Sequence, residues 1–71
     1  MDRQKALQLL DVVSGADKDA AIRGAEELAS DVWPLEVAAG IKNCRDVLAG
    51  KWGSAGPGML RVSINTLREQ M

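Results

Sequence analysis

The sequence predicts an all-α fold, a compact bundle of about four short helices in a single small helical domain spanning residues 1–71. Three observations support this prediction. Apolar residues recur at the three- and four-residue spacing of an α-helix in four separate segments. Short stretches containing Gly, Ser and Pro separate these segments. The one segment that also alternates like a strand has no partner strand elsewhere in the chain.

The first two helices are predicted over residues 2–13 and 17–30. Ser14 and Gly15 end the first helix. Asp17 supplies an N-cap for the second, and Asp19 lies in the first turn, where a negative charge is favourable against the helix dipole. The inward-facing residues are predicted to be Ala6, Leu7, Leu9, Leu10 and Val13 in the first helix and Ala21, Ile22, Ala25, Leu28 and Ala29 in the second.

The third helix is predicted over residues 32–49 and is expected to be the longest. Ser30 or Asp31 is expected to cap it, because Pro34 is tolerated only within the first turn. Gly40 costs roughly 1 kcal/mol relative to Ala inside a helix, which indicates a close crossing with another helix. Gly50 suits the left-handed position that ends a helix. The predicted inner stripe is Val37, Ala38, Ile41, Cys44 and Leu48.

The last helix is predicted over residues 58–71, after a glycine-rich loop over residues 50–58. Leu60, Val62 and Ile64 alternate as in a strand, yet a helical stripe through Leu60, Ile64, Leu67 and Met71 fits equally well. The helix is favoured because a lone strand has no partner and because Pro57 or Gly58 can open a helix.

Composition argues against an enzyme. His is absent and Cys44 is the single cysteine, so the usual ligands for zinc, haem or iron–sulfur sites and the commonest general base are missing. Cys44 falls on an apolar stripe and is expected to pack as a small hydrophobe. The glycine-rich residues 50–58 lack the Gly-Lys-Ser/Thr ending of a P-loop. We therefore expect neither catalysis nor a cofactor.

Membrane association and secretion are not expected. No apolar run approaches the roughly 18 residues of a membrane span. The apolar region of a signal peptide would have to begin within the first ten residues. This part of the chain instead carries the polar residues Asp2, Arg3, Gln4 and Lys5. We therefore predict a cytoplasmic protein with no membrane partner.

The charges divide unevenly along the chain. Residues 1–40 carry four basic and eight acidic groups, whereas residues 41–71 carry five basic and two acidic groups. This split indicates either a basic face for an acidic partner or internal pairing across the bundle, and internal pairing is favoured. The apolar content is mostly small, with ten Ala and no Phe or Tyr. We therefore expect a homo-oligomer or a larger partner, with an apolar helix end such as Leu67 to Met71 covered by a second copy.

Two tryptophans are candidates for recognition, because Trp is common at the energetic centres of protein interfaces. Trp33 is expected to pack internally over the start of the third helix, whereas glycine neighbours leave Trp52 less covered. We predict a small non-catalytic protein–protein interaction module, an adaptor or inhibitor of a larger protein. Its expected partner-binding residues are Trp52, Lys51 and Arg61.

The alternative function is DNA binding through the last helix. Residues 62–69, Val-Ser-Ile-Asn-Thr-Leu-Arg-Glu, resemble the second helix of many helix-turn-helix proteins. The resemblance implies a DNA-binding regulator in which Asn pairs with adenine and Arg with guanine or phosphate. That motif needs a turn of three or four residues before the helix, whereas residues 53–58 are rich in glycine. The implied DNA-facing residues are Ser63, Asn65, Thr66 and Arg68, with Val62, Ile64 and Leu67 packed inward.

Overall fold

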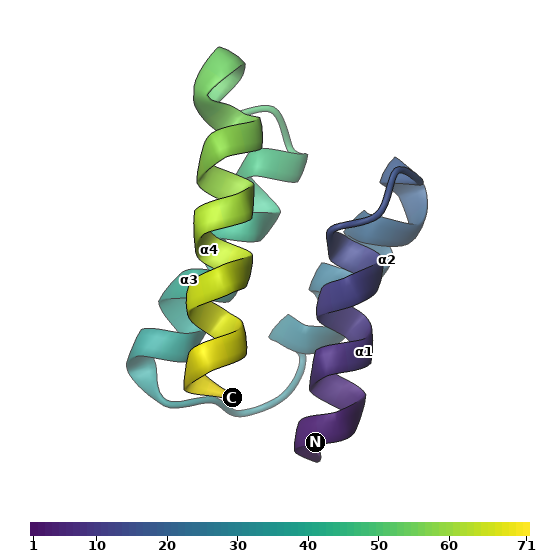
Figure 1. Ribbon diagram of the computed structural model, residues 1–71, viewed down its shortest axis with the longest axis vertical. Helices are drawn as coiled ribbons and strands as arrows, with labels where there is room; N and C mark the ends of the chain where they lie inside the picture. Colours follow the sequence, from purple (N-terminus) through teal and green to yellow (C-terminus); the bar gives the residue numbers. More distant parts are fainter.

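The computed structural model describes residues 1–71 and contains four α-helices, one short 3-10 turn and no strand (Figure 1). The predicted all-α fold is confirmed. The last helix, with 15 residues, is longer than the third, with 14, so the predicted order of lengths is wrong. The elements are α1 (Arg3–Val13), α2 (Lys18–Ala29), α3 (Leu35–Leu48), η1 (Gly53–Ala55) and α4 (Gly56–Gln70).

Each helix packs mainly on its neighbour in the sequence. α3 makes its most extensive contact with α4, α1 packs on α2, and α2 packs on α3. α1 and α4 make few contacts, although Figure 1 shows both in the foreground, in front of α2 and α3. All four helices contribute to one core cluster: Ala6, Leu9, Leu10, Val13, Ala25, Leu28, Val37, Ile41, Cys44, Ile64 and Leu67.

The first two helices begin at carboxylate caps. Asp2 accepts a hydrogen bond from the backbone N–H of Lys5 at 2.7 Å, and Asp17 accepts one from Ala20 at 3.1 Å. These bonds satisfy backbone donors that have no partner inside the helix. The predicted cap at Asp17 is therefore confirmed.

The third helix begins later than predicted, at Leu35, with Pro34 in the N-cap position. Neither predicted residue caps it. Ser30 is the C-cap of α2, and the Asp31 carboxylate accepts the N–H of Val32 at 2.8 Å and pairs with the N-terminal amine. A residue before proline is also disfavoured in the helical region, which keeps Trp33 outside the helix. The Trp33 indole donates to the carbonyl of Leu28 at 2.6 Å and packs against the core, as predicted.

The end of the third helix follows the prediction for Gly50. Gly50 adopts a φ of +83°, and its N–H donates to the Val47 carbonyl at 3.0 Å. The next N–H, of Lys51, donates to the Asp46 carbonyl at 3.0 Å. These two bonds form a Schellman motif, which turns the chain sharply and brings Lys51 back beside the last turn of α3.

Residues 50–58 contain more regular secondary structure than the predicted loop. The 3-10 turn η1 leads directly into α4, which begins at Gly56, two residues before the predicted start. Pro57 fits because the first helical turn needs no N–H from it. Gly56 is buried, and a Cβ there would lie 3.3 Å from Cγ1 of Val47, so the glycine allows the first turn of α4 to approach α3 closely.

Gly40 marks the close helix crossing that the sequence predicts. A Cβ at this position would lie 2.8 Å from Cδ2 and 3.1 Å from Cγ of Leu67 on α4. The Leu67 side chain is fully buried at this crossing. Leu67 is therefore not available to a second copy, and Met71 also packs against the core, so the predicted contact surface from Leu67 to Met71 is wrong.

The inward face of α4 differs from the prediction at two residues. Val62 is 59% exposed, whereas Ser63 is only 6% exposed and donates its hydroxyl hydrogen bond to Sδ of Met59 at 3.5 Å. In a helix Ser63 lies one turn before Leu67 on the same face, while Val62 points away from Ile64. In the other helices, Ala29 and Ala38 are exposed instead of inward, and Gly24 is buried.

Candidate binding site between α2 and α3

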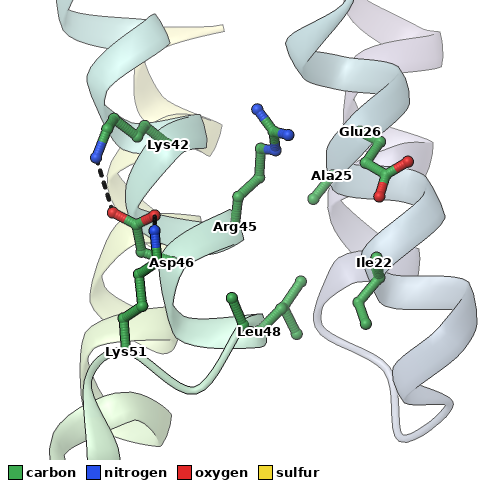
Figure 2. Close-up of a pocket in the computed structure, with 9 residues that line it drawn as sticks. Ile22, Ala25, Glu26, Lys42, Arg45, Asp46, Leu48 and Lys51 are labelled. Carbon is green, nitrogen blue, oxygen red and sulfur yellow. Dashed lines mark hydrogen bonds and ion pairs between the residues drawn. The ribbon is translucent and has the colours of Figure 1, made fainter.

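A groove of about 410 Å³ runs between α2 and the second half of α3 (Figure 2). We call it the α2–α3 groove. Its apolar lining residues, which we call the floor, are Ile22, Ala25, Leu48 and Ala49. Ala25 is fully buried, whereas Ile22 and Leu48 are half-buried. Ile22 and Leu48 are therefore the aliphatic side chains of the floor that another molecule can contact most directly.

Two lysines on the α3 side are held by one carboxylate. Asp46 pairs with Lys42, Nζ to Oδ2 at 2.9 Å, and with Lys51, Nζ to Oδ1 at 3.6 Å. The hydrogen bond from Lys42 and the charges of both lysines lower the pKa of Asp46 below its ordinary value. Asp46 therefore stays ionised at neutral pH and keeps both ammonium groups at this edge of the groove.

Arg45 and Glu26 lie at the groove without ion-pair partners. Neither residue takes part in any of the five ion pairs of the structure. Figure 2 shows the Arg45 side chain extending from α3 toward α2, which carries Glu26. Three basic and two acidic side chains thus border the groove, which makes its edge net positive.

Comparison with known proteins gives no assignment. No protein-family model, curated protein or solved structure matches the chain. What the α2–α3 groove can bind therefore follows from its own residues. A guanidinium without a partner binds carboxylates through two parallel hydrogen bonds, and an apolar floor binds apolar side chains.

Internal pairing explains little of the uneven charge distribution. Of the five ion pairs, only the one between Arg68 on α4 and Asp11 on α1, at 2.8 Å, joins the two oppositely charged parts of the sequence. The pair between Lys5 and Glu27 lies within the acidic part, and both pairs of Asp46 lie within the basic part. Pairing between the acidic and the basic part of the chain, the interpretation favoured from sequence, therefore accounts for one ion pair only.

The three predicted partner-binding residues do not share one groove. Lys51 borders the α2–α3 groove. Arg61 borders a second groove of about 350 Å³ along α4 and the end of α1, which we call the α1–α4 groove. Trp52 lines neither groove and is 38% exposed at the start of η1. Lys42 and Arg45, which the sequence suggested only as basic groups for DNA binding, lie with Lys51 because the Schellman turn reverses the chain after α3.

The predicted DNA-binding residues are only partly exposed. Ser63 is buried with its hydroxyl bonded to Met59, so its predicted contact with DNA is wrong. Asn65, Thr66 and Arg68 are exposed. Asn65 and Arg68 line the α1–α4 groove with Arg61, and Arg68 is paired with Asp11.

Cys44 lies on the inner face of α3 in the core and is 2% exposed. Burial raises the pKa of its thiol to about 11. The thiol is thus protonated at neutral pH, and the thiolate is the nucleophilic form. The structure contains no group of three or more His, Cys, Asp or Glu side chains placed to hold a metal ion, and none of its helices is long and apolar enough to cross a membrane.

Proposed function

We propose that this chain is a small protein–protein interaction module, an adaptor or inhibitor of a larger protein, without catalytic activity of its own. The α2–α3 groove carries this proposal, because it combines an apolar floor with an arginine that has no ion-pair partner. Apolar contact supplies affinity in protein interfaces, and charged groups at the edge supply orientation and specificity. The single free and buried cysteine suits a cytoplasmic location, which we propose with it.

Exposed apolar side chains at the linker between α2 and α3 support the same proposal. Val32 is 93% exposed and Leu35 is 86% exposed. Pro34, Leu35 and Val37 line a shallow depression with Gln70 from the end of α4. Scattered exposed apolar residues are normal, but two aliphatic side chains this exposed within four residues add contact area for a partner.

The test is capture from a lysate of the cells that encode the protein, followed by quantitative mass spectrometry. The wild-type chain is expected to enrich a specific protein above the level obtained with an unrelated helical domain of similar size and charge. Arg45→Glu is expected to reduce that enrichment at least tenfold, a loss of about 1.4 kcal/mol or more. Arg3→Glu changes an exposed arginine on α1 by the same charge and serves as the matched control. The absence of any specifically enriched protein would contradict the proposal.

DNA binding is the alternative function, and one observation favours it. Arg61, Asn65 and Arg68 gather along the α1–α4 groove, which places two arginines and an amide on one surface of α4. Binding to nonspecific duplex should then weaken steeply as the salt concentration rises, because each phosphate contact releases counterions. If the chain is instead a protein-binding module, duplex binding is expected to be absent at physiological ionic strength.

A further inference from the structure

The residues of the α2–α3 groove suit a partner that presents apolar and acidic side chains together. Its volume of about 410 Å³ lies at the lower end of the range for ligand pockets. Four of the nine lining residues are apolar, and Ile22 and Leu48 are the partly exposed aliphatic side chains among them. A small inorganic anion would leave this floor unused, so the occupant must carry apolar side chains.

The charged side chains at the groove favour an occupant that carries negative charge. Arg45 has no ion-pair partner, and Lys42 and Lys51 share the single carboxylate of Asp46. The α3 side therefore carries three cationic groups against one anion, and Glu26 on α2 is the one further acidic residue at the groove. The last carbonyls of α3 carry partial negative charge and attract no anion, so these side chains have to supply the attraction. A partner with carboxylates opposite α3 complements this edge.

The backbone conformation of the occupant follows from the fold. The protein has no sheet edge onto which an extended peptide could add as a strand. A segment that lies between two helices must then satisfy its own backbone hydrogen bonds, and a helix does so internally. Side chains three and four residues apart on one face of such a helix can occupy the apolar floor in succession.

We propose that the α2–α3 groove binds an acidic amphipathic helix of a partner protein. Apolar residues of that helix pack against Ile22 and Leu48, and one of its carboxylates receives two hydrogen bonds from the Arg45 guanidinium. Lys42 and Lys51, positioned by Asp46, attract the remaining acidic residues. This inference rests on the proposed function and adds the chemistry of the partner to it.

The probe is a synthetic amphipathic peptide of about 15 residues, long enough to form a helix on binding. It carries Leu at positions spaced three and four apart and Glu on the flanking positions, and a second peptide has Lys in place of every Glu. Titration of the isotope-labelled protein is expected to shift the backbone amide resonances of Ile22, Arg45 and Leu48. The Glu peptide is expected to bind at least tenfold more tightly than the Lys peptide, as measured by fluorescence anisotropy.

Two variants of equal charge change assign the contact to one groove. Arg45→Glu is expected to weaken the Glu peptide at least tenfold, with the circular-dichroism spectrum unchanged because Arg45 is exposed. Arg3→Glu, which makes the same charge change at an exposed arginine of α1, is expected to leave the affinity unchanged. Equal affinity for both peptides, no binding, or shifts confined to the α1–α4 groove would overturn the inference.

Lysate capture with Arg45→Glu separates this inference from the proposed function. If the wild-type chain captures a protein that Arg45→Glu also captures, the interaction module stands and the acidic occupant of this groove is refuted. If no protein is captured at all, the proposed function fails whatever the peptides do.

Discussion

Gly40→Ala tests the packing between α3 and α4 most directly. The added methyl group would lie 2.8 Å from Cδ2 and 3.1 Å from Cγ of Leu67. Leu67 is fully buried, so its side chain can yield only by displacing other core residues. Overpacking of this kind costs about 1–3 kcal/mol. The replacement of glycine by alanine in a helix returns up to about 1 kcal/mol. We expect a net loss of about 1 kcal/mol.

Two other helical glycines provide matched controls. A Cβ at Gly58 meets nothing within 4 Å, and a Cβ at Gly24 makes ordinary contacts of 3.4 to 3.5 Å with α1. Gly58→Ala is therefore expected to stabilise the protein by about 0.5–1 kcal/mol, and Gly24→Ala is expected to be neutral or stabilising. The three substitutions gain similar helix propensity, so their differences isolate the space around each glycine.

The assay is thermal unfolding followed by circular dichroism at constant protein concentration. For a domain of this size a change of 1 kcal/mol shifts the melting temperature by about 4–8 °C, so Gly40→Ala and Gly58→Ala should move it in opposite directions. In a Leu67→Ala background the contact is gone, and Gly40→Ala should then stabilise. If Gly40→Ala raises the melting temperature as much as Gly58→Ala does, the close crossing is refuted.

Three further predictions address the thiol, the oligomer and the tryptophan. Burial raises the pKa of Cys44 from 9.0 to about 11. The buried neutral thiol therefore contributes its full stability below pH 9, and this contribution is lost as the pH rises toward 11. Urea unfolding should show this loss of stability in the wild type and not in Cys44→Ala. The sequence-based prediction of a homo-oligomer requires a melting temperature that rises with protein concentration, and Leu35→Lys combined with Val32→Lys should remove that dependence; sedimentation of the wild type as a monomer would contradict it. The sequence-based prediction that Trp52 contacts the partner requires Trp52→Ala to weaken partner capture by about 2 kcal/mol or more, the loss typical of an interface hot spot, without loss of helical circular dichroism. The double change Asn65→Ala with Arg68→Ala should then have little effect. If Trp52→Ala unfolds the chain, Trp52 belongs to the core.

The features that depend on a few neighbouring residues could be predicted from the amino-acid sequence. These are the four helices, the cap at Asp17, the left-handed end at Gly50 and the close crossing at Gly40. Helical spacing, capping and the conformational freedom of glycine act within about one helical turn. They can therefore be predicted without knowledge of the tertiary structure.

The start of α3 was predicted incorrectly because one local and one tertiary interaction of Asp31 competed with capping. Asp31 was a suitable cap by residue type, but in the structure its carboxylate binds Val32 and the N-terminal amine. The inward position of Ser63 was missed because a serine is usually exposed. Its burial depends on how α4 is rotated against α3, and Leu67 packed at Gly40 sets that rotation.

The α2–α3 groove was decided by the tertiary structure alone. Ile22 and Leu48 lie 26 positions apart in the chain and meet only because α2 packs on α3. The uneven charge was visible in the sequence, but its pairing was not, since an ion pair depends on distances across the bundle. Arg45 has no ion-pair partner in the structure, and Glu26 lies on α2 at the other side of the groove. Which charges neutralise each other is set by how the helices pack, and a chain of amphipathic helices permits several such packings.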